Sequence, residues 1–143
     1  NKNSATAEIV NCHKVVVKLV IGEATITVDG VSQTIDTSPD LTAGRVFVPL
    51  RAIGQAFGIP ENAINYDAAT KTITIRYKNW DISLQVGSTI AIVNGEKKAL
   101  EAPPYPKANR TMVPLRFIGE AFGADFAWDQ ATKTVTTSLK TCP

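Results

Sequence analysis

The chain has very little of what a metal site needs: one histidine and two cysteines among its 143 residues. His13 stands next to Cys12, while Cys142 lies at the opposite end of the chain. Zinc and type-2 copper sites require several imidazole or thiolate ligands that converge on one ion. The sequence therefore argues against a resident metal, and we expect no cofactor.

Familiar catalytic patterns are missing as well. No serine occupies a Gly-x-Ser-x-Gly turn. The available carboxylates do not have the spacing that glycoside hydrolysis would favour; they include Glu61, Glu120, Asp125 and Asp129. We therefore expect a protein that is not an enzyme.

Strong charge and long apolar runs are also absent. The formal net charge is +2 and no stretch gathers lysines and arginines, which argues against nucleic acid or an anionic membrane as partner. The longest apolar run, residues 15–21, contains Lys18 and is about a third of the ~20 residues that a membrane helix needs. The run predicts a strand and no membrane span.

What the chain has instead is an internal repeat. Residues 45–58 (RVFVPLRAIGQAFG) return as residues 110–123 (RTMVPLRFIGEAFG), an offset of 110 − 45 = 65, and residues 67–72 (DAATKT) return as 129–134 (DQATKT). The copies keep apolar spacing, proline, glycine and turn residues, but no set of reactive groups. A duplicated active site would keep its reactive groups, so the repeat indicates a duplicated scaffold.

Each copy predicts two β-hairpins. Asp29-Gly30 and Asn94-Gly95 predict tight turns that need positive φ, between strands at 24–28 and 31–35 and at 89–93 and 96–100. A second hairpin joins residues 64–67 to 72–75, and 126–129 to 134–139 in the other copy. One more strand precedes each copy, at 15–21 and at 80–86.

Between the hairpins, each copy predicts a proline-containing loop (37–44 and 102–109), a short strand (46–48 and 111–113) and a helix of about two turns. Pro49 and Pro114 suit a first helical turn, and Gly58 and Gly123 suit the position after the last one. The apolar stripe of each helix consists of Leu50, Ile53 and Phe57, or of Leu115, Ile118 and Phe122. Helices this short need a covering sheet.

The combined pattern V(N/D)G … VPLR-x-I-x-x-A-(F/L)G … (W/Y)D-x-A-T-K-T, over residues 15–139, resembles the copper amine oxidase-like N-terminal domain family of secreted bacterial proteins. The resemblance implies an α+β module that serves as a stalk or accessory unit and is not the copper-bearing catalytic domain. We predict two tandem β-rich repeats, each an antiparallel sheet packed around one short helix. The segments are an N-terminal extension (1–13), repeat one (14–78), repeat two (79–140) and a tail with Cys142 (141–143).

The cysteines flank the duplicated segments, Cys12 before the first and Cys142 after the second. Two cysteines favour an oxidising compartment. Pairing within one chain would tie the termini together, whereas pairing between chains would link copies into a covalent polymer. Both arrangements stay open at this point.

The N-terminal extension keeps strand-forming residues, so that strand character runs from Thr6 to Ile21. Such a strand is longer than one small sheet can pair. Its outer half, which includes Thr6, Glu8, Ile9 and Val10, could add to a sheet edge of another copy. A flexible tail is the alternative.

Aromatic and arginine side chains supply the remaining candidates. Tyr105, in the loop Pro103–Pro106, and Trp80 are candidate contacts for a glycan. Arg51 and Arg116 could grip an anion at a helix start, although we expect them to pair with Asp67 or Asp129 of the same repeat.

The segment Asn65-Tyr66-Asp67 is similar to the site at which copper amine oxidases convert a tyrosine into a quinone cofactor. Because the copper ligands are absent and the second copy has Ala127-Trp128-Asp129 at the same place, we interpret this match as a coincidence. The aspartate of each segment is expected to cap a turn.

From these features we expect a secreted, extracellular or cell-surface structural module. It would form a homo-oligomer or homopolymer, such as a filament, through the N-terminal strand and the terminal cysteines. The alternative function is an accessory module that binds cell-wall or other polysaccharides.

Overall fold

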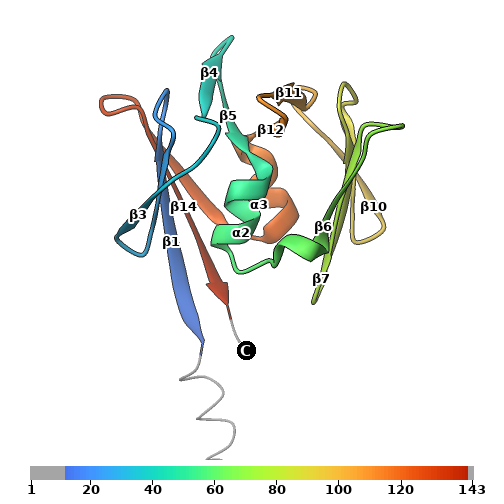
Figure 1. The fold of residues 1–143 in the computed structure, drawn as a ribbon, viewed down its shortest axis with the longest axis horizontal. Helices are drawn as coiled ribbons and strands as arrows, with labels where there is room; N and C mark the ends of the chain where they lie inside the picture. The colour runs from blue at the N-terminus through green and yellow to red at the C-terminus, as the bar shows by residue number, and fades with distance from the viewer. Residues whose placement is uncertain (1–11, 142–143) are drawn as a thin grey trace, which may run out of the picture.

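The computed structural model describes residues 12–141, which form three antiparallel sheets and two α-helices. The two helices lie between two five-stranded sheets, and a four-stranded sheet lies at one end of the helices (Figure 1). The protein is therefore mostly β, with its helices enclosed as a middle layer.

The first sheet has the order β13-β14-β1-β2-β3, with β13 (Asp125–Asp129), β14 (Thr134–Thr141), β1 (His13–Val20), β2 (Thr25–Val28) and β3 (Val31–Thr34). The second sheet has the order β10-β9-β8-β7-β6, with β10 (Glu96–Ala99), β9 (Ile90–Val93), β8 (Trp80–Gln85), β7 (Thr72–Tyr77) and β6 (Ile64–Asp67). The end sheet has the order β11-β12-β5-β4, with β11 (Tyr105–Lys107), β12 (Arg110–Pro114), β5 (Arg45–Pro49) and β4 (Asp40–Thr42).

Strands from both sequence repeats combine in every sheet, which corrects the expectation of one sheet per repeat. β7 runs through a tight turn, with Lys78 at φ 52°, directly into β8, so β8 to β10 extend the sheet that β6 and β7 begin. The hairpin of β13 and β14 then takes β1 as its neighbour, over eight paired residues from His13↔Thr141 to Val20↔Thr134. The first and last described strands therefore lie side by side.

The predicted two-residue turns are confirmed. Asp29 and Gly30 have φ values of 50° and 85°, and Asn94 and Gly95 have 51° and 83°. Each turn is also attached to the adjoining strand by its first side chain. The backbone N–H of Val16 donates to Asp29 Oδ1 at 2.8 Å, and that of Asp81 donates to Asn94 Oδ1 at 2.9 Å.

The two proline-containing loops were only partly predicted. Each contains a three-residue strand, β4 or β11, that pairs with the strand before the helix. β5 and β12 then pair with each other through Met112↔Pro49, Val113↔Val48 and Pro114↔Phe47. The end sheet is therefore a contact between the two sequence copies that their local patterns did not indicate.

The predicted apolar stripes of the helices α2 (Leu50–Ala56) and α3 (Leu115–Phe122) form the centre of the core. All six predicted stripe residues are buried: Leu50, Ile53, Phe57, Leu115, Ile118 and Phe122. The rings of Phe57 and Phe122 meet edge to face with centroids 5.5 Å apart. Gly58 and Gly123 follow the helices with φ values of 94° and 72°, as expected, and the 3-10 turn η1 (Glu61–Ala63) leads from α2 into β6.

Candidate functional site

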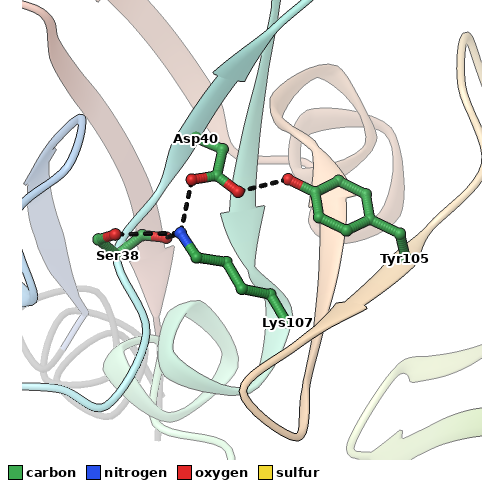
Figure 2. A network of polar contacts seen from close by, with 4 residues as sticks. All are labelled: Ser38, Asp40, Tyr105 and Lys107. Carbon is green, nitrogen blue, oxygen red and sulfur yellow. Dashed lines mark hydrogen bonds and ion pairs between the residues drawn. The ribbon is translucent and has the colours of Figure 1, made fainter.

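The tightest polar cluster described joins β4 to β11 in the end sheet. Tyr105 Oη donates a hydrogen bond of 2.6 Å to Asp40 Oδ2. Lys107 Nζ lies 2.5 Å from Asp40 Oδ1 and donates to the backbone oxygen and the hydroxyl of Ser38, both at 3.1 Å. Figure 2 shows that Tyr105 and Lys107 reach the same carboxylate from one side of the cluster. Four side chains and one backbone oxygen thus satisfy one another.

The titration of this cluster follows its geometry. Partial burial raises the pKa of Asp40, but hydrogen bonds from Lys107 and Tyr105 and the charge of Lys107 outweigh it and leave that pKa below its ordinary value. Burial, and then the hydrogen bond to Asp40, hold the pKa of Tyr105 well above its ordinary value of 10.0. A neutral phenol and an ionised carboxylate indicate a structural cluster, since neither is poised for proton transfer near neutral pH.

The aromatic rings predicted to contact a glycan are engaged within the protein. The ring of Tyr105 packs edge to face on Phe47, with centroids 5.0 Å apart, and that of Trp80 packs on Phe122 at 5.3 Å. Both side chains are half-buried. A ligand contact by either stays a prediction, and the observed contacts give these rings a packing role.

The predicted partners of Arg51 and Arg116 are wrong. Arg51 Nη1 lies 3.9 Å from Glu61 Oε1, and Arg116 Nε lies 3.9 Å from Glu101 Oε2. Asp67 and Asp129 instead cap their own turns by accepting the backbone N–H groups of Ala69 and Ala131, both at 2.9 Å. Turn capping was predicted for the two aspartates.

No metal site is found in the part of the chain that the structure describes. Residues 12–141 contain no group of three or more His, Cys, Asp or Glu side chains placed to hold an ion. His13 Nε2 contacts Asp29 Oδ2 at 3.0 Å, beside the turn that Asp29 begins. Tyr66, of the quinone-like segment, lies on β6 with 48% of its surface exposed.

The terminal features are described only in part. Cys12 directly precedes β1 and does not carry a free thiol. Cys142 lies outside the described residues, as do Thr6, Glu8, Ile9 and Val10 of the predicted assembly strand. The assembly strand and the pairing of the cysteines therefore stay predictions.

Sequence reasoning missed the residues that connect the two copies. Arg110 forms a two-point contact with Asp36, with Nη2–Oδ2 at 2.7 Å and Nε–Oδ1 at 3.3 Å. Lys107 and Asp40 make the second such connection. The only signal in the sequence was the offset of 65 between the copies. It makes Glu101 the equivalent of Asp36, and Tyr105 the equivalent of Asp40.

The described residues form antiparallel sheets around two short helices, and their polar groups serve packing and capping. Such an arrangement is typical of a scaffold. Comparison with known families gives the same class. The copper amine oxidase N-terminal domain family matches residues 1–63 and again residues 61–137, so the chain belongs to this family. No curated protein matches the chain. In the copper amine oxidases this domain is a non-catalytic accessory unit.

None of the described helices is long and apolar enough to cross a membrane.

Proposed function

We propose that the chain is a non-enzymatic structural module, secreted to the cell exterior, that joins copies of itself through its N-terminal strand. The family supplies the accessory role. The observation that carries self-association is an unprotected sheet edge. β3 is an edge strand of the first sheet, and all four of its residues are exposed.

The chemistry of β3 differs from that of its counterpart in the other copy. β3 reads Val-Ser-Gln-Thr, without charge, and Val31 is 63% exposed. The counterpart β10, an edge of the second sheet, reads Glu-Lys-Lys-Ala. Charged side chains, lysine above all, protect sheet edges from pairing with other chains. The β10 edge is therefore protected by charged side chains, whereas the β3 edge can accept an added strand.

The donor in this proposal is the segment with Thr6, Glu8, Ile9 and Val10, within the N-terminal extension of residues 1–13. Strand addition forms main-chain hydrogen bonds along the edge, and alternate side chains of the donor settle on the acceptor sheet. β1 pairs with β14 from His13 to Val20 and with β2 from Val17 to Leu19, so this proposal places the donor before β1 in the chain.

The cysteines have a different role in this proposal. His13 pairs with Thr141, and Cys12 and Cys142 are their neighbours in the sequence. Directly opposed residues in an antiparallel pair have Cα atoms about 4.5–5.5 Å apart, within the range that a disulfide spans. We therefore favour a bridge within one chain, which closes the β1–β14 pair and leaves assembly to the preceding segment.

Electron microscopy and gels of the same preparation test this proposal. We expect fibrils or oligomers by microscopy, and monomers on a denaturing gel with or without thiol reductant. Multimers that disappear only with reductant would show that disulfides between chains make the assembly. Monomers in solution at every concentration would refute self-association.

A matched pair of variants tests the acceptor edge. In a two-residue hairpin closed at Val28↔Val31, the N–H of Ser32 points away from β2. Ser32→Pro removes that donor and should abolish assembly, whereas Lys97→Pro, at the equivalent position of β10, should leave it intact. Equal effects of the two variants would contradict the choice of β3.

The alternative function, polysaccharide binding through Tyr105 and Trp80, has less support because both rings pack inside the molecule. If Tyr105→Ala still binds the glycan, the contact first predicted at Tyr105 is excluded.

A further inference from the structure

Arg51 and Arg116 are the second residues of the equivalent helices α2 and α3, but the surroundings of the two arginines differ. Arg116 is 67% exposed, and its partner Glu101 also lies 3.9 Å from Arg45, so one carboxylate serves two cations. Arg51 is only 20% exposed. The carboxylate equivalent to Glu101 is Asp36, and Arg110 engages both of its oxygens.

Arg51 is consequently left with a weak partner. Its contact with Glu61 is 3.9 Å long, and the Glu61 side chain is 79% exposed, so solvent screens the pair strongly. An arginine whose side chain is four-fifths buried, and whose guanidinium has so weak a partner, gains from an additional anion.

A cavity of about 310 Å³ opens beside this guanidinium, between α2, β6 and the turn from β11 to β12. Arg51 and Arg110 both line it, and among residues 12–141 no carboxylate does. The neighbouring cavity, which shares the same two arginines, contains Asp36 and Glu61. The two arginines therefore line both cavities, and their carboxylate partners Asp36 and Glu61 line only the second.

The rest of the lining suits a sugar. Tyr66 contributes an aromatic ring that is 48% exposed, and Asn109 and Thr111 contribute groups that can hydrogen-bond hydroxyls. The volume is at the lower end for ligand sites, which fits one sugar unit of a longer chain. The cavity beside Arg116 contains Glu101 and Glu120 and corresponds, at the offset of 65, to the neighbouring cavity with Asp36.

We propose that this cavity binds a carboxylated sugar unit, a uronate, of an acidic polysaccharide. The carboxylate takes the guanidinium of Arg51, where two parallel N–H donors match its two oxygens, while the Tyr66 ring supports the sugar face. This site is distinct from Tyr105 and Trp80, and it does not depend on assembly of the chain. A structural module with this site would attach to acidic extracellular glycans.

Binding measurements with defined polymers test the proposal. Polygalacturonate and glucuronate are titrated into the full chain by calorimetry, with inorganic phosphate and a neutral β-glucan as comparison ligands. We expect binding of polygalacturonate, weaker binding of glucuronate and none of the β-glucan. Phosphate binding as tight as that of glucuronate would make the site a general anion site and overturn the sugar assignment.

Matched variants locate the site. Arg51→Gln should weaken polygalacturonate binding by about tenfold or more, the change expected when a charge-assisted hydrogen bond is lost. Arg116→Gln removes the same charge from the equivalent position. It should leave the affinity within about twofold, since the expected change in binding free energy is smaller than that of an exposed ion pair. Equal losses would show that the polymer binds by general charge attraction and would overturn the site.

Two further variants keep the test decisive if Arg51→Gln unfolds. Arg51→Lys keeps the charge but loses the planar fork, and should bind markedly less tightly. Tyr66→Ala removes an exposed ring. It should weaken the binding of polygalacturonate more than the binding of inorganic phosphate. Unchanged affinity in both variants, with thermal unfolding like that of the parent, would refute the proposal.

Discussion

Tyr105 and Asp40 occupy equivalent positions, 65 residues apart, and the phenol of one hydrogen-bonds the carboxylate of the other at 2.6 Å. A duplicated position thus carries two different residues that contact each other. Lys107 binds the same carboxylate, so a single aspartate joins β4 to two residues of β11 (Figure 2). This cluster reinforces the sheet in which the two strands that precede the helices pair.

The first prediction concerns the hydroxyl of Tyr105. Tyr105→Phe keeps the edge-to-face packing on Phe47 and removes one hydrogen bond to a charged group. We expect the free energy of unfolding to fall by about 1.5–3 kcal/mol. Urea denaturation followed by circular dichroism measures it, with Tyr77→Phe as control. A change below about 0.5 kcal/mol, the ordinary range of surface substitutions, would contradict the proposed strength of this contact.

The second prediction concerns the pH dependence of the same cluster. The pKa of Asp40 is lowered in the folded protein, so its contribution is present above its ordinary value of 3.8 and is lost as the pH falls below it. The pKa of Tyr105 is raised, so its contribution is present below 10.0 and is lost as the pH rises above that value.

Denaturation curves across the pH range check both signs. Relative to the parent, Asp40→Asn should lose less stability on acidification, and Tyr105→Phe should lose less at alkaline pH. Parallel curves for the parent and both variants would show that the cluster does not titrate in this way.

The third prediction compares two equivalent helix glycines. A Cβ added at Gly54 would lie 3.5 Å from Ile64 Cδ1, an ordinary contact, whereas one at Gly119 would lie 2.7 Å from Phe126 Cε1 and 3.1 Å from the Ala124 oxygen. Gly54→Ala should therefore stabilise the protein by about 0.5–1 kcal/mol through helix propensity. Gly119→Ala should destabilise it by about 1–3 kcal/mol through overpacking.

Thermal unfolding of the two variants measures the difference. Adding Phe126→Ala to Gly119→Ala removes the clashing ring and should recover part of the loss. If both glycine variants change stability equally, close packing of Phe126 on α3 is not the reason why position 119 requires glycine.

The fourth prediction concerns Cys12. If it is bridged to Cys142, Cys12→Ser should lower the free energy of unfolding by about 2–5 kcal/mol. Thiol reductant should lower the stability of the parent to a similar degree and leave the variant unchanged. A parent that does not respond to reductant would contradict a stabilising bridge between the ends of the chain.

Local features were predictable from the sequence because each depends on neighbours in the chain. The Asp29-Gly30 and Asn94-Gly95 turns follow from the positive φ values that they require, and the helix stripes follow from their spacing. The turn-capping roles of Asp67 and Asp129 likewise depend on residues two positions away.

Contacts across the molecule were not predictable in this way. The sequence places Arg51 near Asp67 only in the sense that both belong to one repeat, and the fold instead brings Glu61 to it. Tyr105 looked available because it lies in a proline-containing segment, but β11 pairs with β12 and turns the ring toward Phe47.

The sequence by itself determined the hairpins, the two short helices and the family of this protein, since these depend on local backbone preferences and on a repeated motif. Only the tertiary structure decided that β1 pairs with β14, and that Arg110 takes Asp36 while Arg51 faces a cavity. The physical reason is that two similarly patterned sets of strands can pair within or between copies, and local patterns do not distinguish these pairings. The β7–β8 hairpin joins strands of both copies in one sheet, which residues within a single copy do not predict.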